Sequence, residues 1–154
     1  MQERLNEKHE TFYEIMTNAS KSDNPVSYLQ NAMKKDSRVA TIIGYALNPR
    51  FKMPLPDSTP PYIPSQHPIG VAPVEILNTH NKLYIMYNKD TKQYKKEEIF
   101  VQWLEDMAPQ EAELMLHIKN QTLDTVYPNM TKEIFVNSLG WSLEQFQRLV
   151  KSEV

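Results

Sequence analysis

Residues 49–73 read PRFKMPLPDSTPPYIPSQHPIGVAP, and this segment determines where helices can form in the chain. It contains eight of the eleven prolines. Each proline fixes its own φ, lacks a backbone N–H and moves the preceding residue out of the α region, so no useful helix crosses the segment. We therefore expect a helical lead over residues 1–48, a proline-rich extended strap over residues 49–73 and a helical bundle over residues 74–154, all in one compact domain.

Apolar residues recur inside this proline-rich segment. They are Phe51, Met53, Leu55, Tyr62 and Ile63. Flexible linkers are rich in glycine and serine instead, so we expect an ordered strap laid over the C-terminal bundle. A surface loop that is functional or mobile is the alternative. Extended proline-rich backbone is also a surface that a partner protein can bind at low entropic cost.

The spacing of apolar residues outside the segment predicts an all-α fold of seven or eight short helices. Asn24, Asp36 or Ser37, and Thr131 are suitable N-caps, and Pro109 suits a first helical turn. Residues 89–96 contain four lysines and are expected to form a hinge. The expected helices cover residues 2–19, 25–35, 37–47, 73–88, 96–107, 109–121, 131–139 and 142–150.

The composition is that of an ordinary soluble domain: 154 residues, 40% apolar, with a net charge of −2. This charge gives no reason to expect nucleic acid or an anionic membrane as the partner. The chain contains no cysteine, which excludes disulfides and zinc–thiolate sites and fits a reducing cytoplasm. Its charged first residues form neither a signal peptide nor a membrane anchor.

Three blocks carry a resemblance to a known family: FKMPLPDSTPPYIPSQHPIGVAP (51–73), IFVQWLEDMAPQEAELMLHIKNQTL (99–123) and YPNMTKEIFVNSLGW (127–141). In this order they resemble a family of small uncharacterised proteins of T4-like tailed bacteriophages, including those that infect cyanobacteria. The resemblance covers residues 51–141. It implies a phage protein made in the cytoplasm of an infected bacterial host, and it implies no activity.

The function we expect is that of a non-enzymatic accessory protein, which binds and modulates a host or phage protein in transcription, replication or antiviral defence. Five residues are the candidate partner contacts: Phe51 and Tyr62 in the segment, and Trp103, Glu105 and Asp106 in the helical region. Phe51 and Trp103 are also suited to a core, Trp103 more so.

Positions 97 to 113 contain six acidic residues and no basic one. One interpretation is a negative helical face that binds a basic groove of the partner. The alternative is the solvated side of two amphipathic helices, where acidic residues near helix starts interact favourably with the helix dipole. The six residues are Glu97, Glu98, Glu105, Asp106, Glu111 and Glu113.

The alternative function is that of a DNA-binding regulator with a helix-turn-helix-like segment at residues 131–151. Its second helix would present Ser142, Gln145, Arg148 and Lys151 to phosphates or base edges. The segment is poor in basic residues, which limits the electrostatic attraction on which DNA affinity depends. A helical hairpin that only packs has the same apolar spacing.

Catalytic motifs are missing from the sequence. It has no G-x-S-x-G, no glycine-rich phosphate loop and no H-E-x-x-H, and it contains only three glycines. Its adjacent carboxylates lie in polar stretches, whereas catalytic carboxylates are usually buried enough to shift their pKa. We therefore expect no enzymatic activity, no metal site and no cofactor.

Overall fold

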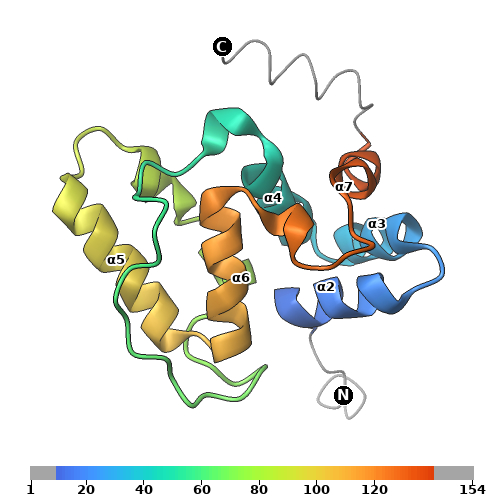
Figure 1. The fold of residues 1–154 in the computed structure, drawn as a ribbon, viewed down its shortest axis with the longest axis horizontal. Coiled ribbons are helices and arrows are strands. Elements are labelled where there is room, and N and C mark those ends of the chain that lie inside the picture. Colours follow the sequence, from blue (N-terminus) through green and yellow to red (C-terminus); the bar gives the residue numbers. More distant parts are fainter. Residues whose placement is uncertain (1–9, 141–154) are drawn as a thin grey trace.

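The computed structural model describes residues 10–140, and over these residues the fold is all-α, as expected, with no strand (Figure 1). The helix expected at residues 142–150 lies outside this range. The α-helices in the range are α2 (Phe12–Lys21), α3 (Pro25–Lys35), α4 (Ser37–Leu47), α5 (Gln93–Asp106), α6 (Pro109–Asn120) and α7 (Lys132–Ser138). The short 3-10 helices are η1 (Pro49–Phe51), η2 (Ile76–Thr79), η3 (Leu83–Tyr87) and η4 (Leu123–Thr125).

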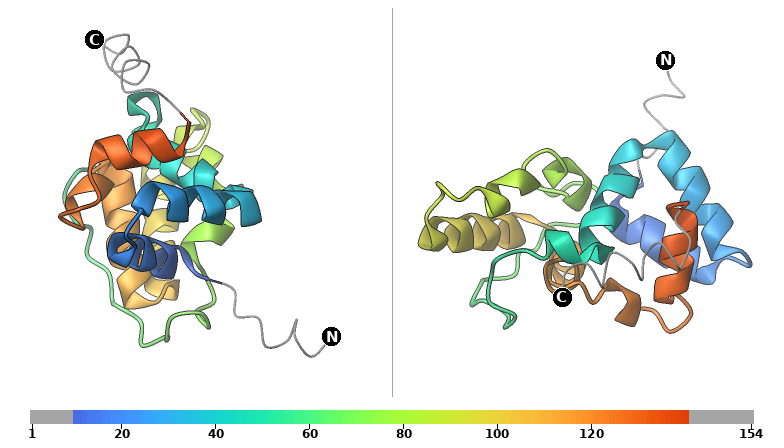
Figure 2. Two further views of the ribbon diagram at one scale, coloured as in Figure 1. Left: turned by 90° about the vertical axis from the view of Figure 1, so that its right-hand side faces the viewer. Right: turned by 90° about the horizontal axis from the view of Figure 1, so that it is seen from above.

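Helix α6 lies at the centre of the arrangement, where it contacts α2, α4 and α5 (Figure 1). Helix α3 contacts α2, α4 and α7. The N-terminal helices and α7 therefore pack together at one end of the molecule, while α5 lies at the other end (Figure 2). One hydrophobic cluster contains residues of all six helices, among them the fully buried Phe12, Ile42, Met115 and Phe135.

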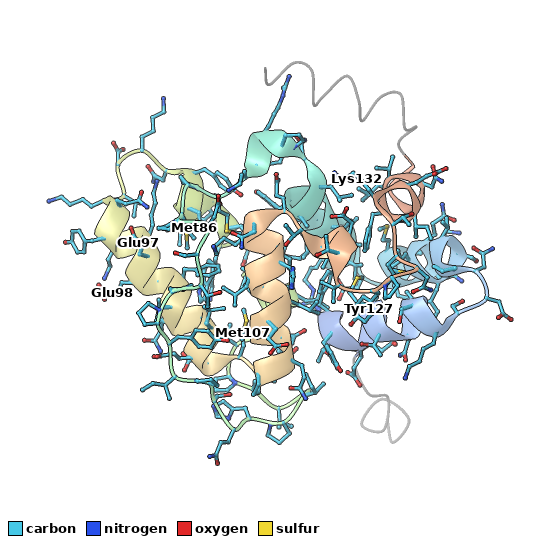
Figure 3. All side chains as sticks on the ribbon, in the orientation of Figure 1. Met86, Glu97, Glu98, Met107, Tyr127 and Lys132 are labelled. Atoms are coloured by element: carbon cyan, nitrogen blue, oxygen red, sulfur yellow. The ribbon has the colours of Figure 1, made fainter. Side chains whose placement is uncertain are left out.

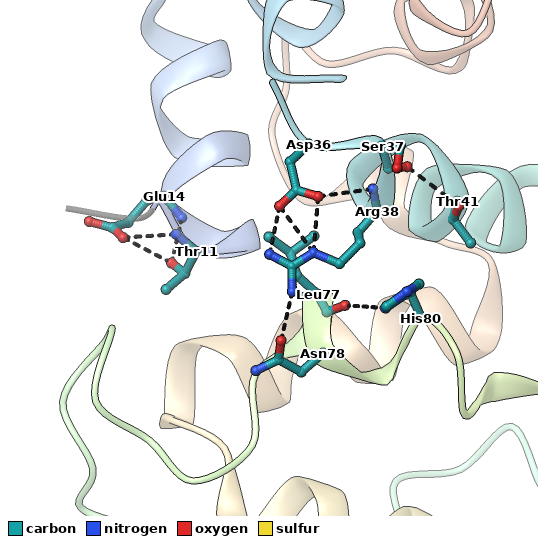
Figure 4. Close-up of polar contacts among 9 residues, drawn as sticks. All are labelled: Thr11, Glu14, Asp36, Ser37, Arg38, Thr41, Leu77, Asn78 and His80. Atoms are coloured by element: carbon teal, nitrogen blue, oxygen red, sulfur yellow. Dashed lines mark hydrogen bonds and ion pairs between the residues drawn. The ribbon is translucent and has the colours of Figure 1, made fainter. Parts of the chain in front are cut away.

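Helix α2 begins at a capping box that Thr11 and Glu14 form. Thr11 Oγ1 accepts from the Glu14 N–H at 3.2 Å, and Glu14 Oε1 accepts from the Thr11 N–H at 3.0 Å (Figure 4). Thr11 itself is extended, with φ −75° and ψ 164°. The expectation of a helix over residues 2–19 is therefore wrong at residues 10 and 11, because the capping pair lies inside that range.

The N-caps expected at Asn24, Asp36 and Thr131 are confirmed, since each accepts a backbone N–H from the first turn of its helix. Asp36 has a second role, because its carboxylate pairs with the Arg38 guanidinium at 2.7 Å. Arg38 also donates to the Asn78 side-chain oxygen at 2.7 Å, which connects the start of α4 to η2 (Figure 4).

Two further expectations about helices are wrong. Residues 73–88 form the 3-10 helices η2 and η3 instead of one α-helix. Within η2 the Thr79 hydroxyl donates to the Ile76 carbonyl at 2.6 Å. In an α-helix this carbonyl would accept from the backbone N–H four residues later, so the side chain competes with the α-helical hydrogen bond. The hinge expected at residues 89–96 is shorter, because α5 begins at Gln93.

Gln121 ends α6 and also caps α4. Its backbone is left-handed, with φ 57°, and this conformation follows the last turn of α6. Its side-chain Nε2 donates to the carbonyls of Tyr45 at 3.1 Å and Asn48 at 2.5 Å. The last carbonyls of a helix have no partner within the helix, so Gln121 stabilises the end of α4 while it terminates α6.

Glu111, in the first turn of α6, joins three segments that are distant in sequence. It is 1% exposed. Oε2 accepts from the Tyr13 N–H at 3.0 Å, and Oε1 accepts from the Ile76 N–H at 2.9 Å. These N–H groups belong to the first turns of α2 and η2, where a helix provides no acceptor for them. Desolvation raises the pKa of Glu111, and the two hydrogen bonds oppose that rise without cancelling it.

We expect the Glu111→Gln substitution to change how stability depends on pH. Because folding raises the pKa of Glu111 above its ordinary value of 4.5, the folded state binds this proton more tightly than the unfolded state. The contribution of Glu111 to stability is therefore full below about pH 4.5 and falls as the pH rises through the folded pKa. In urea unfolding, the free energy of unfolding of the wild type relative to E111Q should decrease as the pH rises above about 4.5.

The matched control is Glu113→Gln, which removes the same charge from an exposed position on α6. It touches neither of the two backbone N–H groups, so its stability relative to the wild type should not show that trend. Parallel stability curves for the wild type and E111Q would contradict the assignment.

Candidate functional site

A cleft of about 600 Å³ lies between the proline-rich segment and α5. Residues 52–75 form no helix or strand, and the proline-rich segment passes across α5 (Figure 1). Residues between 55 and 61 form one wall of the cleft, and residues of α5 between 94 and 105 form the other. Lys119 of α6 completes the lining.

The α5 wall combines apolar and acidic side chains. Tyr94, Glu98, Val101 and Glu105 are three or four positions apart, so they lie on one face of the helix. Tyr94 is 66% exposed. Glu97 also lines the cleft, and Figure 3 shows Glu97 and Glu98 along α5, far from Lys132 on α7.

Two hydrogen bonds fix the segment to α5 at either end of the cleft. Gln93 Nε2 donates to the Pro54 carbonyl at 2.8 Å, and Glu105 Oε2 accepts from the Ile63 N–H at 2.8 Å. The twelve positions from 93 to 105 span about 18 Å of helix. The nine positions from 54 to 63 would span about 28 Å as a polyproline II helix. The segment is therefore longer than the stretch of helix beside it and curves away from α5 between its two attachments. We call this curved part, residues 54–63, the bow, and the cleft lies between it and α5.

Lys119 holds the bow from the side of α6. It is 1% exposed, and its Nζ donates to the Pro56 carbonyl at 2.5 Å, to the Asn120 side-chain oxygen at 2.7 Å and, at 3.4 Å, to the Ser58 carbonyl. Asn120 in turn donates to the Asp57 carbonyl at 3.0 Å. Desolvation lowers the pKa of Lys119. Its three donors are all used, which is how a buried ammonium is tolerated.

The charges that line the cleft are mostly negative. Glu97, Glu98 and Glu105 oppose the single ammonium of Lys119. Glu98 has a basic neighbour in Lys95 at 3.6 Å, but both side chains are largely exposed and such a pair is weak. The cleft thus presents carboxylates on apolar walls.

The candidate contacts in the proline-rich segment lie in different surroundings. Phe51 is 41% exposed and packs with Tyr45 and Tyr87, with ring centroids 4.9 and 6.1 Å away. The Tyr87 hydroxyl donates to the Phe51 carbonyl, and desolvation raises the pKa of Tyr87. Tyr62 is half-buried against the core near one end of the cleft, where burial raises the pKa of its hydroxyl.

The candidate contacts in α5 divide between the core and the surface. Trp103 is 7% exposed and packs edge-on against Phe100, so it is a core side chain with little surface left for a partner. Glu105 lines the cleft. Asp106 is turned along α5, where its carboxylate accepts from the Gln102 side chain at 2.9 Å.

The acidic stretch at positions 97–113 does not form one exposed face. Glu111 is buried and bonded to backbone N–H groups, as described above, so it is excluded from any charged surface. Sequence reasoning also missed Gln93, Tyr94 and Lys119. Gln93 and Tyr94 fall in the hinge expected at 89–96, and no local pattern marks Lys119 as buried, nor Lys96 at 7% exposure.

The proposed DNA-reading residues Ser142, Gln145, Arg148 and Lys151 lie outside the described residues. Within residues 10–140, α7 occupies the place of the first helix of that motif. No group of three His, Asp or Glu residues in that range could hold a metal ion. No helix there is long and apolar enough to cross a membrane.

A family model described as "Family of unknown function (DUF6433)" matches residues 12–125. The match runs from α2 through η4 and so includes both walls of the cleft. No curated protein and no solved structure matches the chain.

We expect Lys119→Met to release the bow of the proline-rich segment. Methionine retains the apolar stem but leaves the carbonyls of Pro56 and Ser58 without their donor, which should lower the free energy of unfolding by about 1–3 kcal/mol. Amide hydrogen exchange at residues 57–59 should be several-fold faster in the native variant than in the wild type. Lys95→Met, at an exposed position of α5, is the control and should leave this exchange rate unchanged. Equal rates for wild type and K119M would contradict the attachment.

Proposed function

We propose that this chain, which belongs to the DUF6433 family of unknown function, binds and modulates another protein and is not an enzyme. The observation that carries the proposal is the cleft between the proline-rich segment and α5, with its apolar walls and exposed carboxylates. The residues proposed to contact the partner are Phe51, Tyr62, Tyr94, Glu105 and Asp106.

The way in which charged groups are used supports a binding role. Buried ionisable groups with shifted pKa values are the usual candidates for catalysis. Among residues 10–140, the buried charged groups with shifted pKa values are Glu111 and Lys119, and both are engaged by backbone groups. Each holds segments of the fold together, which accounts for its burial without any chemistry on a substrate.

The resemblance of residues 51–141 to proteins of T4-like tailed bacteriophages supports a finer proposal. The chain acts in the cytoplasm of an infected bacterium as an accessory protein, and its target is a host or phage protein in transcription, replication or antiviral defence. The proline-rich segment contributes as a preformed strap, because side chains of α5 and α6 fix its carbonyls before a partner arrives.

A tagged chain recovered from infected bacteria should retain one host or phage protein. A photo-crosslinking phenylalanine analogue at position 94 or 62 should join the chain covalently to that protein. The same analogue at Asn31, an exposed position on α3, is the control and should give no adduct, because α3 lies at the end of the molecule away from α5. Adducts of equal yield from all three positions, or none from 94 and 62, would count against the proposal.

A DNA-binding regulator is the second candidate. Gly140 directly follows the C-cap of α7 with a left-handed φ of 82°, and this is the turn that a helix-turn-helix at 131–151 requires. Under our proposal, a labelled duplex should show no change in fluorescence anisotropy with micromolar protein at about 50 mM salt. Tight binding that weakens steeply as salt is added would favour the DNA-binding function instead.

A further inference from the structure

We infer that the cleft between residues 55–61 and α5 binds a peptide segment of the partner that carries an arginine or lysine beside an apolar residue. The inference rests on the proposed function and adds the chemistry by which the partner is recognised.

The charge of the cleft selects a cationic group. Glu97, Glu98 and Glu105 line it, and all three belong to a wall made by α5. The opposing ammonium, Lys119, already donates to three oxygens and is 1% exposed, so it has no donor left for an anionic ligand. Glu97 accepts from the Gln93 side chain at 3.1 Å and Glu98 pairs with Lys95, but the lining keeps an excess of negative charge. An arginine or lysine that enters the cleft is therefore attracted, whereas an acidic peptide or a phosphate backbone is repelled.

The walls of the cleft suit the rest of such a side chain. Pro60 and Pro61 belong to one wall, and Val101 and Tyr94 belong to the other. The aliphatic stem of arginine or lysine gains by lying along apolar walls of this kind, with its charge at the carboxylates. A guanidinium can also stack on the exposed ring of Tyr94, one helical turn from Glu97 and Glu98. A neighbouring apolar residue of the same peptide fills the remaining volume, since about 600 Å³ exceeds one side chain.

The cleft is formed before a ligand arrives. Gln93 and Glu105 hold the two ends of the bow, and Lys119 holds its middle. The proline-rich backbone between them has little conformational freedom to lose. Binding therefore does not have to pay the entropic cost of ordering the site, so weak individual contacts with a peptide contribute to the binding free energy.

Selection from displayed random dodecapeptides on the full-length chain tests the inference. Peptides enriched by the wild type should contain arginine or lysine next to an apolar residue. The best of them, labelled with fluorescein and measured by anisotropy, should bind the Glu98→Arg variant at least about ten-fold more weakly, because the reversal places a like charge in the cleft. Added salt should weaken binding to the wild type.

Glu133→Arg is the matched control, since it makes the same reversal at an exposed position on α7. It should change the affinity by less than about two-fold, and both variants should unfold at the wild-type temperature. Enrichment of peptides without basic residues, or equal weakening by E98R and E133R, would overturn the inference. Displacement by spermine as effective as displacement by the unlabelled peptide would also overturn it, because the cleft would then bind a cation without reading a peptide.

The outcome can be separated from that of the proposed function. A partner that crosslinks at position 94 yet still binds the E98R variant leaves the function standing and removes the inference. Basic peptides that bind the cleft, without any protein partner in infected cells, leave the inference standing and remove the function.

Discussion

The buried carboxylate of Glu111 is the interaction on which the arrangement of the chain depends. It accepts from Tyr13 at the start of α2 and from Ile76 at the start of η2, while it belongs to the first turn of α6. One side chain therefore supplies the missing acceptors for two segments separated from it by 98 and 35 positions. Burying a carboxylate is costly and raises the pKa of Glu111, and two hydrogen bonds to the charged group offset part of that cost. Gln121 joins α6 to α4 by a similar device at the other end of the central helix.

The proline-rich segment is organised by the same shortage of backbone partners. Proline has a carbonyl but no N–H, so a segment rich in proline presents acceptors that no ladder or helix can satisfy. Side chains of α5 and α6 supply the missing donors. Gln93 donates to the carbonyl of Pro54, Lys119 donates to those of Pro56 and Ser58, and Asn120 donates to that of Asp57. Burial of Lys119 follows directly, because an ammonium with three carbonyl or amide acceptors is satisfied away from water. The cleft results from these attachments, because they hold a segment beside a stretch of helix that is shorter than the segment itself.

The features of the fold that depend on neighbouring residues could be predicted from the sequence. Those that depend on contacts between residues distant in sequence could not. Asn24, Asp36 and Thr131 could be recognised as caps because a cap needs only the residues of one turn. The start of α2 was missed although Thr11 and Glu14 form a capping box, because the apolar spacing continued through it. The burial of Glu111 and Lys119 depends on backbone partners more than thirty positions away, which no local pattern indicates. Of the candidate contacts, Glu105 lines the cleft and Tyr62 lies beside it, whereas Trp103 belongs to the core.

The two kinds of charge in this fold have different consequences for binding. Glu111 and Lys119 are buried and engaged by the fold, so a partner gains nothing from them. The carboxylates of Glu97 and Glu98 are exposed on α5, and Pro56, Pro60 and Pro61 in the other wall have no backbone N–H to donate to them. Their neighbours Gln93 and Lys95 leave both carboxylates with lone pairs for further donors. Arginine and lysine supply donors that also carry positive charge, and on this ground we infer that the cleft favours a basic segment.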